Sequence, residues 1–250
     1  MIGRSAAAAI DYGSYLTRRS IARKPSAIRA LQPLVALPGM ISLGGGMPNP
    51  STFPFTRITA ELADGSGSIE LTGPTLQAAL QYSPTPGLPS LVAHLKRLQD
   101  AEHGPLRPDT EVCVTTGSAD ALSKAFDALV DEGDALLVES PTFSGSLAYL
   151  QPIGCKLVGV DCDGKGLRPD ILGQTLEQWD EAREGAPRPR VLYTIPSGGN
   201  PTGASQDAER KREIYEIARR YDLLVLEDDP YHWLQYARAL APDAHARGRE

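Results

Sequence analysis

The chain has 250 residues, which is generous for one domain and short for two. Hydrophobic residues make up 41% of it and charged residues 22%, as in ordinary globular proteins, so wholesale disorder is excluded. A net charge of −6 without a long basic block argues against nucleic acid as the main partner, and no apolar run reaches the roughly 18 residues that a membrane span needs.

The N-terminal segment is rich in basic residues. Among the first 30 residues, Asp11 is the single acid, whereas arginines and lysines stand at positions 4, 18, 19, 23, 24 and 29. This composition is compatible with an organellar presequence. Because the text from Tyr12 to Leu34 reads on as one segment, we favour a solvated N-terminal arm or helix over residues 1–39.

Residues 40–110 are expected to form loops and one helix. Met40–Phe55, which contains ISLGGGMPNPSTFPF, and Gln81–Pro89 (QYSPTPGLP) are rich in glycine and proline and read as specifically shaped loops. The second loop leads into a predicted helix, whose apolar residues at 88, 91, 92, 95 and 98 have helical spacing.

From residue 111 onward, short β-rich runs alternate with stretches of helical length. Strands are expected at 111–115, 135–139, 156–160, 190–194 and 222–227, with helices at 119–130, 144–150, 170–179 and 207–221. The alternation is typical of βαβ units and predicts an α/β fold over 111–236, a three-layer αβα arrangement with a mainly parallel sheet. Residues 237–250 lose both periodicities and are expected to be an unstructured tail.

Ligands of open α/β sheets bind at the carboxyl ends of the strands, so the segments that follow the expected strands matter most. In TTGSADAL (115–122), Gly117 permits a tight turn, and Ser118 and Ala119 open a helix whose backbone N–H groups would cradle a phosphate. A plain capped helix is the alternative. In ESPTFSGS (139–146), Phe143 offers a flat face to an aromatic ligand, unless it is simply a core residue.

Two further segments are more specific. Ordering the loop IPSGGNPTG (195–203) costs much backbone conformational entropy because it contains three glycines. The loop contains Asn200, whose side chain can both donate and accept hydrogen bonds. In LEDDPYHWL (226–234), acids follow a buried strand, and Asp228 and Tyr231 stand three residues apart. A carboxylate facing a protonated ring nitrogen, with a phenol facing a ring oxygen, would tune an electron-poor heterocycle.

The competing ligands have weaker sequence support. Paired acids also suit Mg²⁺, but a Walker-type phosphate loop is absent from the sequence, as is a G-x-G-x-x-G that follows a strand. The three cysteines lack CxxC spacing and the four histidines form no ligand pattern, so we expect no metal site and a reducing compartment.

The order GSADAL, SPTFSG, SGGNPTG, EDDPY resembles the fold-type I pyridoxal-phosphate enzymes of the class I/II aminotransferases. PSAIRAL, ISLGGGMPNPSTFPF and ALQYSPTPGLPSL make it look like the aminoadipate/kynurenine branch, and the resemblance runs from about Tyr12 to Tyr236. It implies pyridoxal phosphate as cofactor, an amino acid (2-aminoadipate or an aromatic, kynurenine-like one) and a 2-oxo acid as substrates, and a homodimer. The implied compartment is the cytoplasm, with the mitochondrion as the alternative.

The resemblance also implies individual roles. Ser118 and Ala119 would hold the cofactor phosphate, Phe143 would stack on the pyridine ring, and Asp228 would pair with the ring N–H⁺. Asn200 and Tyr231 would hydrogen-bond the ring O3′. Three residues nearer the N-terminus complete the implied set, namely Tyr82 for the partner subunit's cofactor phosphate, and Arg29 and Gly46 for the substrate.

One family feature is missing from the chain. The Schiff-base lysine would follow Asp-Pro-Tyr by several tens of residues in a Ser-x-Ser-Lys type motif, but the chain ends at Glu250, and its lysines at 24, 96, 124, 156, 165 and 211 all precede Asp228. We therefore assign no catalytic residue and expect a large domain truncated before that lysine, inactive as given. The alternative is a non-catalytic remnant that binds pyridoxal phosphate or interferes with dimers.

Overall fold

The computed structural model describes residues 10–24, 26–35, 37–44, 46–104 and 110–234. The chain forms two compact units: Met1–Arg23 together with Thr116–Glu250, and Lys24–Thr115. We call them the sheet unit and the hairpin unit. The expected tail at 237–250 lies outside the described residues.

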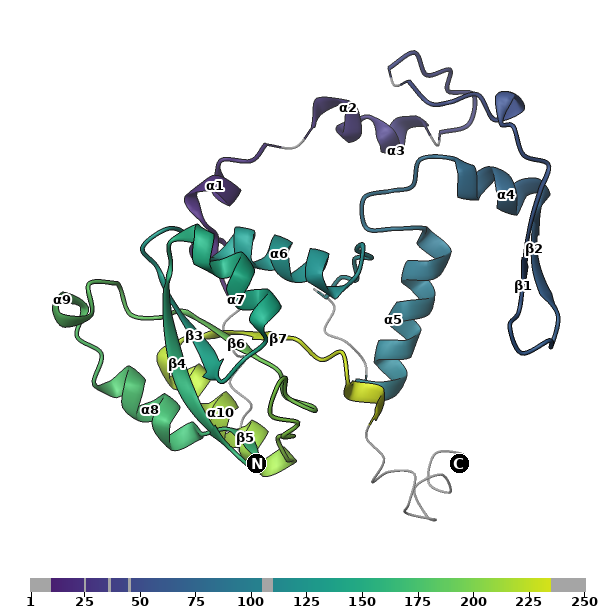
Figure 1. The fold of residues 1–250 in the computed structure, drawn as a ribbon. Helices are drawn as coiled ribbons and strands as arrows, with labels where there is room; N and C mark the ends of the chain where they lie inside the picture. Colours follow the sequence, from purple (N-terminus) through teal and green to yellow (C-terminus); the bar gives the residue numbers. More distant parts are fainter. Residues whose placement is uncertain (1–9, 25, 36, 45, 105–109, 235–250) are drawn as a thin grey trace, which may run out of the picture. The chain divides into compact units, whose positions relative to one another are not determined.

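The sheet unit is built on a five-stranded sheet of order β5-β4-β3-β6-β7 (Figure 1). Four strands are parallel, and the short β5 runs antiparallel to β4. Their bounds are Ala135–Ser140 (β3), Lys156–Asp163 (β4), Gly166–Leu167 (β5), Val191–Thr194 (β6) and Leu224–Glu227 (β7). The strands predicted from residue 135 onward are thus confirmed, and β7 forms an edge of the described sheet.

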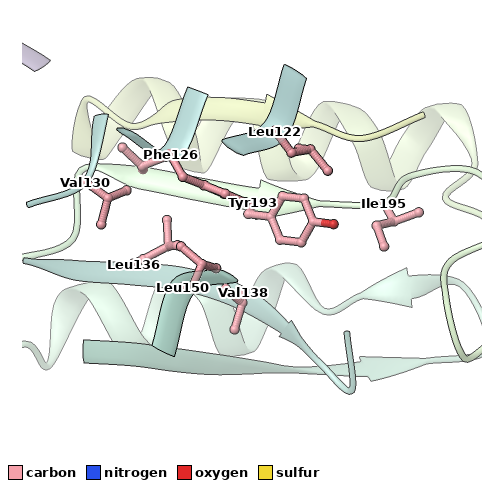
Figure 2. Close-up of a cluster of buried hydrophobic side chains, with 9 residues drawn as sticks. Leu122, Phe126, Val130, Leu136, Val138, Leu150, Tyr193 and Ile195 are labelled. Atoms are coloured by element: carbon pink, nitrogen blue, oxygen red, sulfur yellow. The ribbon is translucent and has the colours of Figure 1, made fainter. Parts of the chain in front are cut away.

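Helices cover both faces of this sheet. They are α6 (Ser118–Leu129), α7 (Ser144–Leu150), α8 (Pro169–Glu177), α9 (Glu181–Glu184) and α10 (Ala208–Tyr221), with 3-10 turns η3 (Gln151–Ile153) and η4 (His232–Leu234). Successive residues of β3 point to opposite faces. Leu136 packs under α6 and α7, as Figure 2 shows, whereas Leu137 packs toward α8 and α10. The predicted three-layer αβα fold is confirmed.

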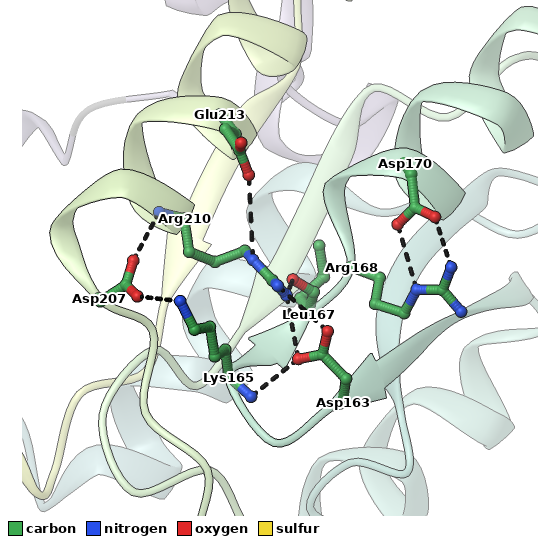
Figure 3. A network of polar contacts seen from close by, with 8 residues as sticks. All are labelled: Asp163, Lys165, Leu167, Arg168, Asp170, Asp207, Arg210 and Glu213. Atoms are coloured by element: carbon green, nitrogen blue, oxygen red, sulfur yellow. Dashed lines mark hydrogen bonds and ion pairs between the residues drawn. The ribbon is translucent and has the colours of Figure 1, made fainter.

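A polar network joins the β4–β5 hairpin to α10 (Figure 3). Arg210 donates from Nη1 and Nη2 to the two carboxylate oxygens of Asp163, both at 3.1 Å, and from Nη1 to the carbonyl of Leu167 at 3.0 Å. Lys165 pairs with Asp207, the N-cap of α10, at 2.8 Å. The bidentate geometry fixes the end of β4 against the first turn of the helix.

The expected arm at 1–39 is divided: its part up to Arg23 belongs to the sheet unit, and the rest belongs to the hairpin unit. The described elements of the first part are η1 (Tyr12–Tyr15) and α1 (Arg18–Ile21). Tyr15 and Thr17 are buried, and Thr17 donates from N to the carbonyl of Ala128 at 2.8 Å and from Oγ1 to that of Asp127 at 3.0 Å. Most described residues of this segment are exposed, as expected, but the segment is not continuous, because Thr17 has an extended backbone and caps the end of α6, and the chain divides after Arg23.

The hairpin unit contains the predicted helix, α5 (Pro89–His103), and several elements that we did not predict. These are α2 (Ala27–Ala30), α3 (Gln32–Val35), η2 (Pro50–Thr52), the antiparallel strands β1 (Arg57–Glu61) and β2 (Ser68–Thr72), and α4 (Gly73–Leu80). The predicted strand at 111–115 is wrong. That segment is no strand, and Val114 N instead donates to the carbonyl of Pro86 at 2.8 Å, which holds the segment against a loop.

Candidate functional site

A cavity of about 190 Å³ lies in the sheet unit, beside the carboxyl ends of β3, β6 and β7. Its walls come from four segments: the first turn of α6, the loop after β3, the loop after β6 and the loop after β7. The lining residues are Ser118, Ala119, Leu122, Phe143, Ile195, Asn200, Asp228, Pro230 and Tyr231. A parallel sheet brings the loops after its strands to one edge, which is why Phe143, Asn200 and Asp228 meet here, and the first turn of α6 joins them although no strand directly precedes it.

The cavity brings together six of the nine residues that we predicted for the site. Ser118, Ala119, Phe143, Asn200, Asp228 and Tyr231 all line it. The other three belong to the hairpin unit. Tyr82 and Gly46 are exposed there, and Arg29 lies in α2 with its side chain outside the described part of the structure.

The first turn of α6 supplies a polar wall. Gly117 is the N-cap with a φ of 90°, a conformation that favours glycine, and no side chain caps this end of the helix. Asp120 accepts from Thr116 N at 3.0 Å and pairs with Lys124, which keeps the pKa of Asp120 below its ordinary value. The first N–H groups of α6 and the Ser118 hydroxyl therefore stand at the cavity with the positive end of the helix dipole.

Phe143 supplies the aromatic wall, and a glycine fixes its ring. Phe143 is the N-cap of α7 and packs its ring partly against the core cluster. A Cβ at Gly145 would lie 2.5 Å from two atoms of this ring. Only glycine at 145 permits the ring to lie where it does.

Asn200 lies in a loop whose two ends are joined by backbone hydrogen bonds. Gln206 N donates to the carbonyl of Pro196 at 2.8 Å, and Gly199 N donates to that of Ala204 at 2.7 Å. Below these bonds, the buried carboxyl of Glu139 accepts from Thr194 Oγ1 at 2.6 Å and from Ile195 N at 3.2 Å. Burial raises the pKa of Glu139, although these hydrogen bonds oppose the rise.

Asp228 is half-buried and held by a tyrosine. Tyr193 donates from its hydroxyl to Asp228 Oδ2 at 2.9 Å, and Ser146 donates to that hydroxyl at 2.9 Å. Burial raises the pKa of Asp228, and the nearby Asp229 adds to the rise, whereas the hydrogen bond from Tyr193 lowers it. Sequence reasoning missed Tyr193 and Glu139 because each stands inside or at the end of an apolar run that reads as core, and it missed Ser146 because this residue lies in the polar first turn of the predicted helix at 144–150.

Comparison with known proteins identifies the family. The family described as "Aminotransferase class I and II" matches residues 44–246. The chain belongs to the class I and II aminotransferases. A curated member, the mitochondrial kynurenine/alpha-aminoadipate aminotransferase of Bos taurus, is 41% identical over 245 residues, which cover 93% of this chain and 57% of the relative.

Solved aminotransferases have the same fold. Aro8 of Candida albicans has a TM-score of 0.82 at 33% identity, covering 91% of this chain and 51% of that one. A kynurenine aminotransferase of Pyrococcus horikoshii, solved with PMP, has a TM-score of 0.57 at 28% identity, covering 88% and 52%. This chain thus spans about half the length of the aminotransferases it resembles.

The cofactor of class I and II aminotransferases is pyridoxal phosphate, and the cavity suits that molecule chemically. It combines the first turn of a helix for an anion, an aromatic face for a flat ring, and a carboxyl group for a protonated nitrogen. Asn200 and Tyr231 add polar groups for a ring oxygen.

None of the described lysines lines this cavity. Lys124, which stands nearest to it in sequence, pairs with Asp120 on the exposed side of α6. Across the described residues, no cluster of three or more His, Cys, Asp or Glu is arranged to hold a metal. The helices of the described ranges include none with the length and apolar character that crossing a bilayer requires.

Proposed function

We propose that this chain forms the pyridoxal-phosphate-binding part of an aminotransferase, one that moves an amino group from an amino acid to a 2-oxo acid. A single observation carries the proposal: one cavity at the carboxyl edge of the sheet collects Ser118, Ala119, Phe143, Asn200, Asp228 and Tyr231. The cofactor-binding region is then 111–236, with residues 40–110 contributing substrate and dimer contacts and 1–39 the arm.

Each side chain has a defined task in this proposal. The Ser118 hydroxyl and the N–H groups of the first turn of α6 bind the phosphate, and the Phe143 ring covers the pyridine. Asp228 holds a proton at the ring nitrogen, while Asn200 and Tyr231 orient the ring through its oxygen. When bound, the protonated pyridine withdraws electrons from the carbon that carries the amino group, so that its proton can leave.

The substrate class rests on similarity and on the hairpin unit. The names of the relatives mention kynurenine, alpha-aminoadipate and aromatic amino acids, which supports 2-aminoadipate or a kynurenine-like aromatic amino acid as the donor. Arg29 and Gly46 would contact this substrate, and Tyr82 would reach the cofactor phosphate of the second copy in a homodimer. The mammalian relatives are named mitochondrial, which supports that compartment over the cytoplasm.

An equilibrium titration tests the proposal. The purified chain should bind pyridoxal phosphate saturably, as a change in cofactor absorbance, and Asp228→Asn should weaken binding by about tenfold to a hundredfold because a charge-assisted hydrogen bond is lost. Asp170→Asn, which changes an exposed carboxylate paired with Arg168, is the matched control and should bind normally. Absence of saturable binding, or equal loss in both variants, would contradict the proposal.

A second function follows from the lysines. Because no described lysine lines the cavity, the chain by itself fits a module that binds pyridoxal phosphate without turnover. Binding together with measurable amino transfer from kynurenine or 2-aminoadipate to 2-oxoglutarate would rule out this alternative. Binding without transfer supports it.

A further inference from the structure

Tyr193 is an unusual core residue because its hydroxyl is buried as completely as its ring. The side chain has 0% exposure and lies in the middle of the apolar cluster of Figure 2, with Phe126 edge-on at 5.4 Å between ring centroids. A hydroxyl so placed must be satisfied by protein groups. Its two partners, Ser146 on α7 and Asp228 after β7, come from different elements.

The direction of these two hydrogen bonds is fixed by chemistry. An ionised Asp228 can only accept, so the single proton of the Tyr193 hydroxyl must point to Asp228 Oδ2. The Tyr193 oxygen is then free to act as an acceptor, and the Ser146 hydroxyl donates to it. Ser146, Tyr193 and Asp228 thus form a one-way chain that ends on an acid lining the cavity.

The charges around this chain favour an uncharged Tyr193. Burial raises the pKa of Tyr193, and the carboxylates of Asp228 and Glu139 raise it further, so the phenol stays protonated. Among the described residues, two titratable groups act on the Asp228 carboxyl: Asp229 disfavours its ionised form, and the hydrogen bond from Tyr193 favours it. Tyr231 lines the same cavity.

We propose that Tyr193 is a positioning residue for Asp228: its hydroxyl donates to Oδ2 and favours the ionised carboxyl, which leaves Oδ1 for a protonated ring nitrogen in the cavity. Ser146 contributes by donating a hydrogen bond to the Tyr193 oxygen, which leaves the Tyr193 proton for Asp228. The part of this inference that concerns the ring nitrogen rests on the proposed function, whereas the effect on Asp228 itself does not.

The test compares two tyrosines that both pack on Phe126 and both donate to a carboxylate, Tyr193 buried beside the cavity and Tyr149 partly exposed and away from it. Tyr193→Phe removes the hydroxyl and keeps the ring. Tyr149→Phe is the matched control, because Tyr149 also packs on Phe126 and also donates to a carboxylate, Asp127, at 2.9 Å. Carbon-13 NMR of the Asp228 carboxyl in the cofactor-free chain gives its pKa directly, and circular dichroism checks that each variant is folded.

We expect the pKa of Asp228 to rise in Tyr193→Phe, to rise less in Ser146→Ala and to stay unchanged in Tyr149→Phe. Pyridoxal phosphate should bind about tenfold more weakly to Tyr193→Phe than to the wild type near neutral pH. This difference in affinity should become smaller as the pH is raised, because the Asp228 carboxyl of the variant then ionises. Ser146→Ala, the smaller change, serves if Tyr193→Phe does not fold.

An unchanged Asp228 titration in both Tyr193→Phe and Ser146→Ala would overturn the inference, as would an equal shift in Tyr149→Phe. If the wild-type chain does not bind pyridoxal phosphate, the proposed function fails. The titration of Asp228 in the cofactor-free chain still decides whether Tyr193 acts on it.

Discussion

Gly145 has a defined consequence for the aromatic wall of the cavity. Alanine there would place its Cβ 2.5 Å from the Phe143 ring, so the ring must move. We expect Gly145→Ala to weaken pyridoxal phosphate binding by about tenfold, because the stacking face is displaced. The affinity is measured by absorbance titration. Gly164→Ala, where a Cβ meets nothing within 4 Å, is the control and should bind like the wild type.

Glu139 should make stability depend on pH. Burial raises its pKa in the folded chain, so as the pH rises the unfolded chain ionises first, and stability falls until the pH has passed the folded pKa. Glu139→Gln removes this loss. The free energy of unfolding of the variant, relative to the wild type, should therefore increase between pH 4 and pH 8 by on the order of 1 kcal/mol.

Urea unfolding at several pH values measures this difference. Glu177→Gln, at an exposed position in α8, provides the control for replacing a carboxyl by an amide. The same pH profile in both variants, or a flat profile for Glu139→Gln, would contradict the prediction.

At the residue scale, position after a strand was the informative signal. Ser118, Phe143, Asn200 and Asp228 were predicted because each follows or nearly follows an expected strand, and the cavity contains all four. Tyr193 gave no such signal. It stands within β6, where alternation places its side chain in the core, and the partners of its hydroxyl arrive from α7 and from the segment after β7.

At the scale of elements, Arg210 is the residue that fastens β4 and β5 to α10. Arg210→Lys keeps the charge but loses the two-point contact with Asp163 and the bond to the Leu167 carbonyl. We expect a loss of about 1–2 kcal/mol in the free energy of unfolding, measured with urea. Arg219→Lys, an exposed residue paired with Glu216, should change it by less than about 0.5 kcal/mol.

In the sheet unit, strands and helices with a buried face were predictable, whereas the exposed hairpin of the other unit was not. β3, β6 and α7 follow clear apolar patterns and were found within a residue or two. The β1–β2 hairpin is exposed along nearly its whole length, so burial leaves no alternation in it. The Asp64-Gly65 pair in its turn was the available signal. The run at 111–115 is β-rich, yet composition cannot show that a strand has no neighbour to pair with.

At the scale of the whole molecule, the arm should contribute strongly to the stability of the sheet unit. Tyr15 is buried, stacks under Arg190 at 4.6 Å and donates from its hydroxyl to the carbonyl of Asp222 at 3.1 Å. Tyr15→Ala should therefore cost about 3 kcal/mol in urea unfolding monitored on the sheet unit. Tyr12→Ala, at an exposed position in the same turn, should cost less than about 1 kcal/mol.

The arm could not have been placed from the sequence. Its hydrogen bonds to the rest of the sheet unit join residues 107 to 207 positions apart, and no local pattern reports contacts at such separations. Composition showed an arginine-rich segment and no more. Two of those arginines, Arg18 and Arg19, pair with Asp131 and Asp127 at the end of α6.

The sheet unit is built from two separate stretches of the chain, which sets an order of events during synthesis. The arm leaves the ribosome first, but the Asp222 carbonyl that receives the Tyr15 hydroxyl is made 207 residues later. At ~5–20 residues per second, this interval lasts ~10–40 s. Throughout this interval the nascent chain carries Tyr15 without the carbonyl that its hydroxyl will contact, so this contact must await translation of Asp222.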